Sequence, residues 1–160
     1  MNTKLNDFKE VMHKGMIENF TKDGFLTPIL FFFQDDKPVI GIISYELLST
    51  AHGKKQLAAY IKNKCCEPNV TAGGIIMEAY GAKIFKDNIE AEKIMKGEIN
   101  ISEMNNAKDI IIMIFSTPEK EETFTYVVDC ETKTVKENFS PEETEMGNGI
   151  FNDFFKWRKN

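Results

Sequence analysis

The chain has 160 residues, of which 42% are hydrophobic and 28% charged, and a formal net charge of −5. These values are typical of one globular domain with a normal core. The negative balance argues against nucleic acid as the main partner, because phosphate binding needs a concentrated basic surface. No apolar run reaches the roughly 20 residues that span a bilayer, and the first residues lack the apolar segment of a signal peptide. We therefore expect a cytoplasmic protein that binds neither nucleic acid nor a membrane.

The first third of the chain predicts a helix followed by a β-hairpin. Apolar residues recur three and four positions apart over residues 4–22, and Gly24 suits the left-handed position that ends a helix. The apolar stripe of this helix comprises Leu5, Phe8, Met12, Met16 and Phe20, widened by Val11 and Ile17. Residues 26–43 then predict two buried strands joined by a polar turn at 35–38. Pro38 lacks an N–H and so belongs at a sheet edge or a strand start.

The middle of the chain predicts a helix within residues 45–66, capped by Ser44, with Gly53 as the expected point of a break. A third strand follows near 73–80, and a meander of three strands comes later in the chain. The strands of this meander are predicted near 109–115, 123–128 and 133–138. A polar insertion, residues 84–107 with a short helix near 88–96, is predicted between the third strand and this meander. An acidic linker, residues 141–149, precedes a predicted C-terminal helix.

Written as α-β-β-α-β-β-β-α, this order predicts a single α+β domain over residues 1–160. Its core would be one five-stranded, mainly antiparallel sheet with helices packed on it, an order that resembles the roadblock, longin and profilin-like folds. The chain also resembles a group of uncharacterised bacterial and phage proteins, through residues 23–28, 78–80 and 101–108, with Tyr80 where that group has Trp. This resemblance implies a fold and a bacterial or phage origin, and it implies no activity.

Glu78 is the strongest candidate for a chemical site. It lies near the end of the otherwise apolar third strand, where burial would raise the pKa of an unpaired carboxylate. Such a group can act as a general base or as the carboxylate of a ligand pocket, with His52 and Tyr80 as the residues that would complete the site. The alternative, which we favour, is a structural carboxylate that is exposed or paired with Lys83 or Lys108.

The remaining chemistry-bearing residues predict no metal or cofactor site. Cys65, Cys66 and Cys130 lack the second spaced pair of a zinc motif, and we expect them to be free, buried and inert thiols. His13 and His52 are expected at surface or half-buried positions. Gly73-Gly74 opens a strand and not a helix, and Gly147-Asn148-Gly149 precedes a helix but does not follow a strand. No phosphate-binding loop is therefore predicted.

The aromatic C-terminal segment leaves two alternatives open. Phe151, Phe154, Phe155 and Trp157 carry more apolar surface than a solvent-facing helix tolerates. The segment either docks on its own sheet or forms the contact with a partner or a second copy. Because no nucleophile–base pair is present, we expect a non-enzymatic protein that binds a protein partner or itself. The alternative is a small-ligand binder or enzyme with Glu78 as the pocket carboxylate.

Overall fold

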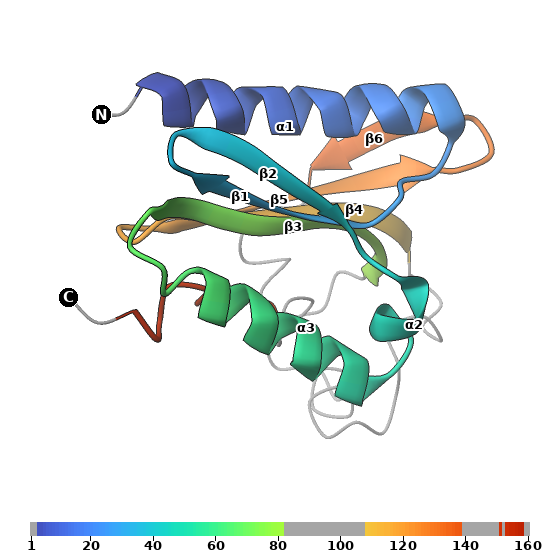
Figure 1. Ribbon diagram of the computed structural model, residues 1–160. Coiled ribbons are helices and arrows are strands. Elements are labelled where there is room, and N and C mark those ends of the chain that lie inside the picture. Colours follow the sequence, from blue (N-terminus) through green and yellow to red (C-terminus); the bar gives the residue numbers. More distant parts are fainter. Residues whose placement is uncertain (1–2, 82–107, 139–150, 152, 159–160) are drawn as a thin grey trace, which may run out of the picture.

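The computed structural model of the protein describes residues 3–81, 108–138, 151 and 153–158. Within them, helices lie on both faces of one antiparallel sheet, which gives three layers (Figure 1). The elements are α1 (Thr3–Asp23), β1 (Ile29–Gln34), β2 (Lys37–Ile42), α2 (Tyr45–Leu48), α3 (Ala51–Lys64), β3 (Val70–Gly81), β4 (Lys108–Ser116), β5 (Glu121–Asp129) and β6 (Thr134–Asn138). The predicted insertion 84–107 with its helix near 88–96, and the acidic linker 141–149, lie outside the described residues.

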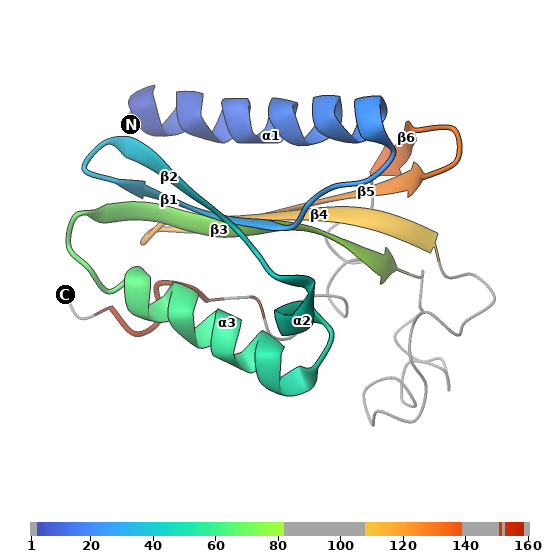
Figure 2. The same cartoon turned by 45° about the vertical axis from the view of Figure 1, so that its right-hand side comes forward.

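The sheet has the strand order β2-β1-β3-β4-β5-β6, and each neighbouring pair is antiparallel. The predicted α+β class is therefore confirmed. The strand number is corrected, because the described sheet contains six strands. The predicted order and the five-stranded sheet left out one of the six strands whose ranges the sequence indicated. The hairpin β1–β2 forms one side of the sheet, and the meander β3 to β6 continues it from β1 outward (Figure 2). Among the described strands, β2 and β6 are consequently the edges.

The core on the first face lies between α1 and the sheet. Every fourth residue of α1 is buried there, from Phe8 through Met12 and Met16 to Phe20, as expected for a helix that packs one stripe of its surface. The Phe8 ring is stacked on the Phe33 ring of β1, with the centroids 5.0 Å apart. Val11 was predicted to belong to this stripe, and that prediction is wrong, because Val11 lies on the flank of α1 and is exposed.

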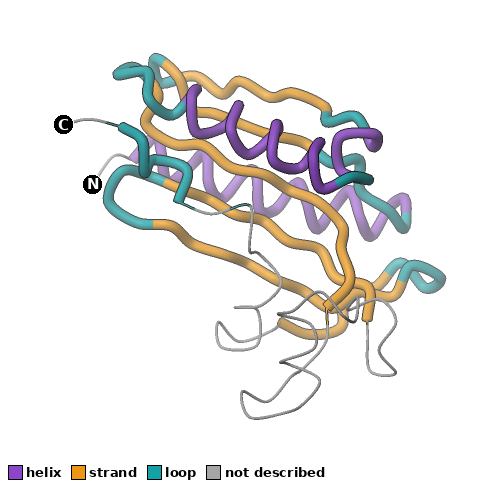
Figure 3. The backbone as a smooth tube through the Cα atoms, turned by 90° about the horizontal axis from the view of Figure 1, so that it is seen from below, coloured by secondary structure: helices purple, strands orange, loops and turns teal. Residues whose placement is uncertain are grey.

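The core on the opposite face lies between α3 and the sheet (Figure 3). The predicted helix 45–66 divides into α2 and α3, and the break falls at Ser49 and Thr50 instead of Gly53. Thr50 caps α3, because its Oγ1 accepts a hydrogen bond of 2.9 Å from the Gly53 N–H. Gly53 lies in the first turn of α3, where an added Cβ would collide with the backbone of Leu47. Glycine is thus required there by close approach and not by a break.

The hairpin turn consists of two residues, Asp35 and Asp36, with φ angles of 52° and 59°. Two consecutive positive φ values define the turn type that matches the twist of a two-residue hairpin, and aspartate tolerates this conformation better than most residues. The polar turn is confirmed, and so is the edge position of Pro38. The prediction that both strands of the hairpin are buried is wrong, because only β1 is covered on both faces.

Candidate functional site: the open strand β2 and its groove

The open side of β2 presents backbone groups that no described strand pairs with. The Ile43 N–H donates to the Pro28 carbonyl at 2.9 Å, and hydrogen-bonded pairs alternate along an antiparallel ladder. From this alternation and the register of β1 with β2, the N–H groups of Ile40 and Ile42 point away from β1. Pro38 occupies the remaining outward position and contributes only its carbonyl. The edge therefore offers two donors and three acceptors to another chain.

Apolar side chains are exposed along this same edge. The exposed fractions of Val39, Ile40 and Ile42 are 42%, 56% and 78%. Phe25 and Val11 border the strand on the α1 face, and further exposed aromatic residues, Tyr45 and Tyr60, stand near it. Monomeric proteins seldom leave so many large apolar side chains exposed together, and such patches mark interaction sites. We name these seven residues the β2 patch.

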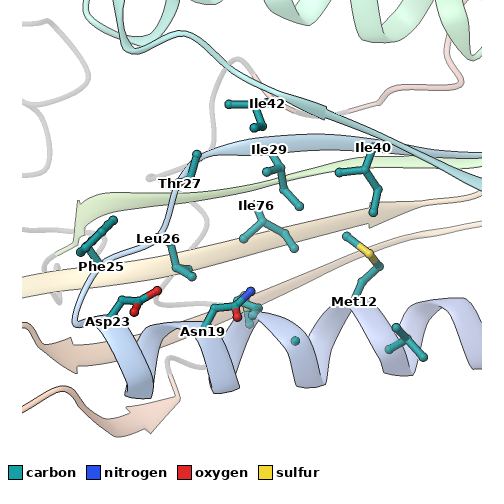
Figure 4. A pocket seen from close by; sticks show the side chains of 13 residues that line it. Met12, Asn19, Asp23, Phe25, Leu26, Thr27, Ile29, Ile40, Ile42 and Ile76 are labelled. Atoms are coloured by element: carbon teal, nitrogen blue, oxygen red, sulfur yellow. The ribbon is translucent and has the colours of Figure 1, made fainter.

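A groove of about 540 Å³ separates α1 from the β1–β2 hairpin. Figure 4 shows Ile40 and Ile42 projecting from the strand side, with Met12 and Asn19 projecting from the helix side. Gly15 of α1 also lines the groove, and a Cβ added to it would meet nothing within 4 Å. The groove is thus open above Gly15 and lined mainly by apolar side chains, which suits the side chains of a docked chain.

The opposite edge of the sheet has a different sequence character. Strand β6 consists of Thr134, Val135, Lys136, Glu137 and Asn138, a composition with charges that natural proteins use to discourage pairing at an edge. Strand β2 carries one charged residue, Lys37, at its first position and apolar residues afterward. Only one of the two edges is therefore protected by its sequence.

Glu78, the predicted site carboxylate, lies on β3 and faces the α1 side of the sheet. Its Oε1 accepts a hydrogen bond of 3.1 Å from the Leu26 N–H, which holds the connection between α1 and β1. Burial raises the pKa of Glu78 above its ordinary value, the Leu26 hydrogen bond opposes that change, and the charge of Asp109 adds to it. The carboxylate thus satisfies a backbone donor of the α1–β1 connection. The predicted choice between a structural carboxylate and the carboxylate of a ligand pocket stays open.

The structure does not bring Glu78 and His52 together. His52 lies at the exposed start of α3, on the other face of the sheet. Tyr80 lies two residues after Glu78 on β3, opposite Asp109 of β4. His13 is half-buried and its Nε2 lies 2.6 Å from the Tyr126 hydroxyl oxygen. Burial and the nearby Lys9 charge lower the pKa of His13, which favours the neutral form of the imidazole in this contact between α1 and β5.

The aromatic C-terminal residues divide between core and surface. Phe151 and Phe154 are buried in the core under α3, which favours docking on the protein's own sheet. Phe155 packs against that core, and Trp157 is 46% exposed with the Lys62 ammonium 5.4 Å from its ring centre. This segment is not the predicted helix, because residues 154–157 form turns.

Two charged side chains hold this segment. Arg158 donates to the backbone carbonyls of Val70 at 2.8 Å and Pro68 at 3.0 Å. The Asp153 N–H donates to Oε2 of Glu121 at 3.2 Å. Asp153 itself has a positive φ of 51°, a conformation that no α-helix continues through. The chain thus bends where Phe151 and Phe154 must both reach the sheet, which is the physical reason for turns in place of a helix.

The three cysteines are free thiols in this structure. Burial raises the pKa of Cys65 to about 12, so its thiol stays protonated and unreactive at neutral pH. Cys130 is exposed, contrary to the prediction of burial. In the part of the chain that the structure describes, no three His, Cys, Asp or Glu side chains are grouped to hold a metal ion. No described helix is long and apolar enough to cross a bilayer.

No known protein family, curated protein or solved structure matches this chain. The resemblances to uncharacterised bacterial and phage proteins and to roadblock-like folds therefore stay predictions. Val39, Ile40 and Ile42 were missed as a site because they were assigned to a buried strand, and Val11 was missed because it was assigned to the buried stripe of the first helix. Pro38 was the one signal in the sequence that pointed to this edge, since proline is excluded from the middle of a sheet.

Proposed function

We propose that the protein is a non-enzymatic interaction protein that binds another polypeptide chain along β2. The observation that carries this proposal concerns Ile40 and Ile42. Their N–H groups pair with no strand among the described residues, and their apolar side chains are exposed. An added strand would gain backbone hydrogen bonds from the edge and side-chain contacts from the groove. This mode of binding needs no catalytic group, metal or cofactor.

Site-specific photo-crosslinking tests the proposal. A photoreactive residue at position 42 should form an adduct with a polypeptide when the protein is illuminated in its native cell extract. The matched control places the same residue at position 157, the exposed tryptophan of the C-terminal segment. Adducts at position 157 but not at position 42 would move the binding surface to the C-terminal segment and refute the proposal.

A second candidate function is the binding of a small apolar ligand in the groove. Its volume of about 540 Å³ lies within the range of small-molecule sites. Leu26 lines the groove and its N–H is held by Glu78, so Glu78 would position the wall of the pocket and not contact the ligand directly. Native mass spectrometry distinguishes this candidate, because a retained small mass should be lost when Gly15→Leu fills the groove.

A further inference from the structure

We infer that the chain that pairs with β2 is a second copy of this protein, related by a two-fold axis perpendicular to the sheet at Ile40. This inference rests on the proposed function, because it specifies the partner for the same edge. In such a dimer the two β2 strands run antiparallel and the two sheets become one. The α1 helices of both copies then lie on one face of the joined sheet, and the α3 helices lie on the other.

The backbone groups of the edge are complementary to themselves in this arrangement. The N–H of each Ile40 would donate to the carbonyl of Ile40 in the second copy. The N–H of each Ile42 would donate to the carbonyl of Pro38 in the second copy, and Pro38 has no donor to leave unsatisfied. Both outward donors derived from the register therefore find an acceptor, which is the condition that a buried strand edge must meet.

The exposed side chains lie on both faces of the edge strand, and this favours a folded partner over a lone peptide strand. Ile40 and Ile42 line the groove on the α1 face. Val39 alternates to the α3 face, where Tyr60 of α3 lies with its ring 6.3 Å from that of Phe32, the residue paired with Val39. A single strand would cover the isoleucines and leave Tyr60 exposed. A second copy would place its own α1 layer beside α1 and its own α3 layer beside α3, so it would cover the edge strand on both faces.

The β2 patch supplies a large part of the area that a stable dimer buries. Its seven side chains are between 42% and 78% exposed. Since a large aromatic residue can bury about 150–250 Å², the patch supplies several hundred Å² on each copy. A standard interface buries about 800 Å² per partner. The two-fold operation places Ile40 against Ile40 and Ile42 against Pro38 of the second copy, so apolar side chains meet at the centre of the contact.

Sedimentation velocity tests the oligomeric state, with the protein concentration varied from about 1 µM to about 100 µM, a range that detects micromolar dissociation constants. We expect a species of twice 18.3 kDa that increases with concentration. Ile40→Lys and Ile42→Lys should each raise the dissociation constant at least about 100-fold. At position 40 the symmetry places two lysine charges in one apolar contact, and at position 42 each lysine charge faces Pro38 of the second copy. Trp157→Lys, an exposed apolar residue outside the patch, should leave it unchanged.

Amide hydrogen exchange measured by NMR tests the interface itself. In the dimer, the amides of Ile40 and Ile42 should become protected as concentration rises, and circular dichroism should confirm that both lysine variants stay folded. A monomer at the highest concentration with fast exchange at both amides would overturn the second copy. The crosslinking at position 42 then decides the proposed function separately, since an adduct with a different polypeptide would leave it standing. A dimer that survives Ile40→Lys and Ile42→Lys but is lost in Trp157→Lys would also overturn the inference.

Discussion

The two strands of the hairpin both consist mainly of apolar residues, but they differ in environment. Strand β1 contains Phe31, Phe32 and Phe33, which are at most 3% exposed, while its neighbour β2 contains Ile40 and Ile42, which are mostly exposed. The two strands are paired residue by residue. Strand β1 is covered because β3 pairs on its other side and helices lie on both of its faces. Hydrophobicity therefore does not indicate by itself which of two paired strands the described sheet and helices cover.

The largest expected effect comes from truncating one residue of each strand at a cross-strand pair. Phe31→Ala should lower the free energy of unfolding by about 3–5 kcal/mol, because Phe31 is fully buried and its loss leaves a cavity. Ile40→Ala, at the partner position, should lower it by less than about 1 kcal/mol, as for other exposed positions. Urea unfolding at one low protein concentration measures both values. Equal losses would show that β2 is as covered as β1.

A smaller effect should separate the two glycines that flank β1. Gly74 of β3 is paired with Phe31, and a Cβ there would collide with the Ile114 carbonyl and the Phe31 ring. Gly74→Ala should therefore cost about 1–3 kcal/mol, the usual range for overpacking. Gly41 of β2 is paired with Leu30, whose Cδ1 would lie 3.3 Å from an added Cβ and can move aside. The midpoint of urea denaturation for Gly41→Ala should stay close to that of the wild type. A large loss for this variant would contradict an open β2 edge.

The smallest effect concerns the charge of Glu78 on β3, the strand that pairs with β1 on the side opposite β2. The pKa of Glu78 is raised in the folded state, so the folded protein binds its proton more tightly than the unfolded chain. Stability from this group is therefore full below the ordinary carboxyl pKa and is lost as pH rises through the folded pKa. Glu78→Gln should match the wild type in acid and exceed it at pH 8 by less than about 1 kcal/mol, since the group is largely exposed.

Urea denaturation at pH 4 and pH 8 measures this difference. The Glu78→Gln variant is expected to keep the hydrogen bond, because an amide carbonyl can accept from the Leu26 N–H in place of the carboxylate. If this variant were less stable than the wild type at pH 8, the carboxylate charge would be shown to stabilise the fold, opposite to the direction of its pKa change.

Much of the fold follows from local sequence patterns. The four-residue spacing of Phe8, Met12, Met16 and Phe20 predicted α1, and Ser44 was correctly assigned as the cap of α2, since its side chain accepts from the Glu46 N–H. The break after α2 was predicted at Gly53 but lies at Ser49 and Thr50. Whether Thr50 caps a helix depends on tertiary packing that lets the chain turn there, and the neighbouring residues in sequence do not encode that packing. Local patterns thus predicted the elements better than their junctions.

The candidate site was much less predictable than the fold. Glu78 was singled out because it is polar in an apolar strand, and the structure gives it a backbone partner that comes from a loop 52 residues away in sequence. Ile40 and Ile42 were assigned to a buried strand because periodicity cannot reveal whether a covering layer exists. Val11 was likewise placed in the buried stripe of α1. Whether an apolar residue faces the core or a groove depends on contacts between distant segments.

The two cores of the protein are completed at different times during its synthesis. The buried members of the α1-face core end at Val128, whereas the α3-face core also requires Phe151 and Phe154. A chain emerges from the ribosome N-terminus first, and its segments begin to fold in that order. The α1 layer can therefore pack on the sheet before Phe151 and Phe154, the last two buried residues of the α3-face core, have been synthesised. Leu57 and Ile61 of α3 belong to the same cluster as these two phenylalanines, so a chain that ended before Phe151 would lack part of the packing on this face.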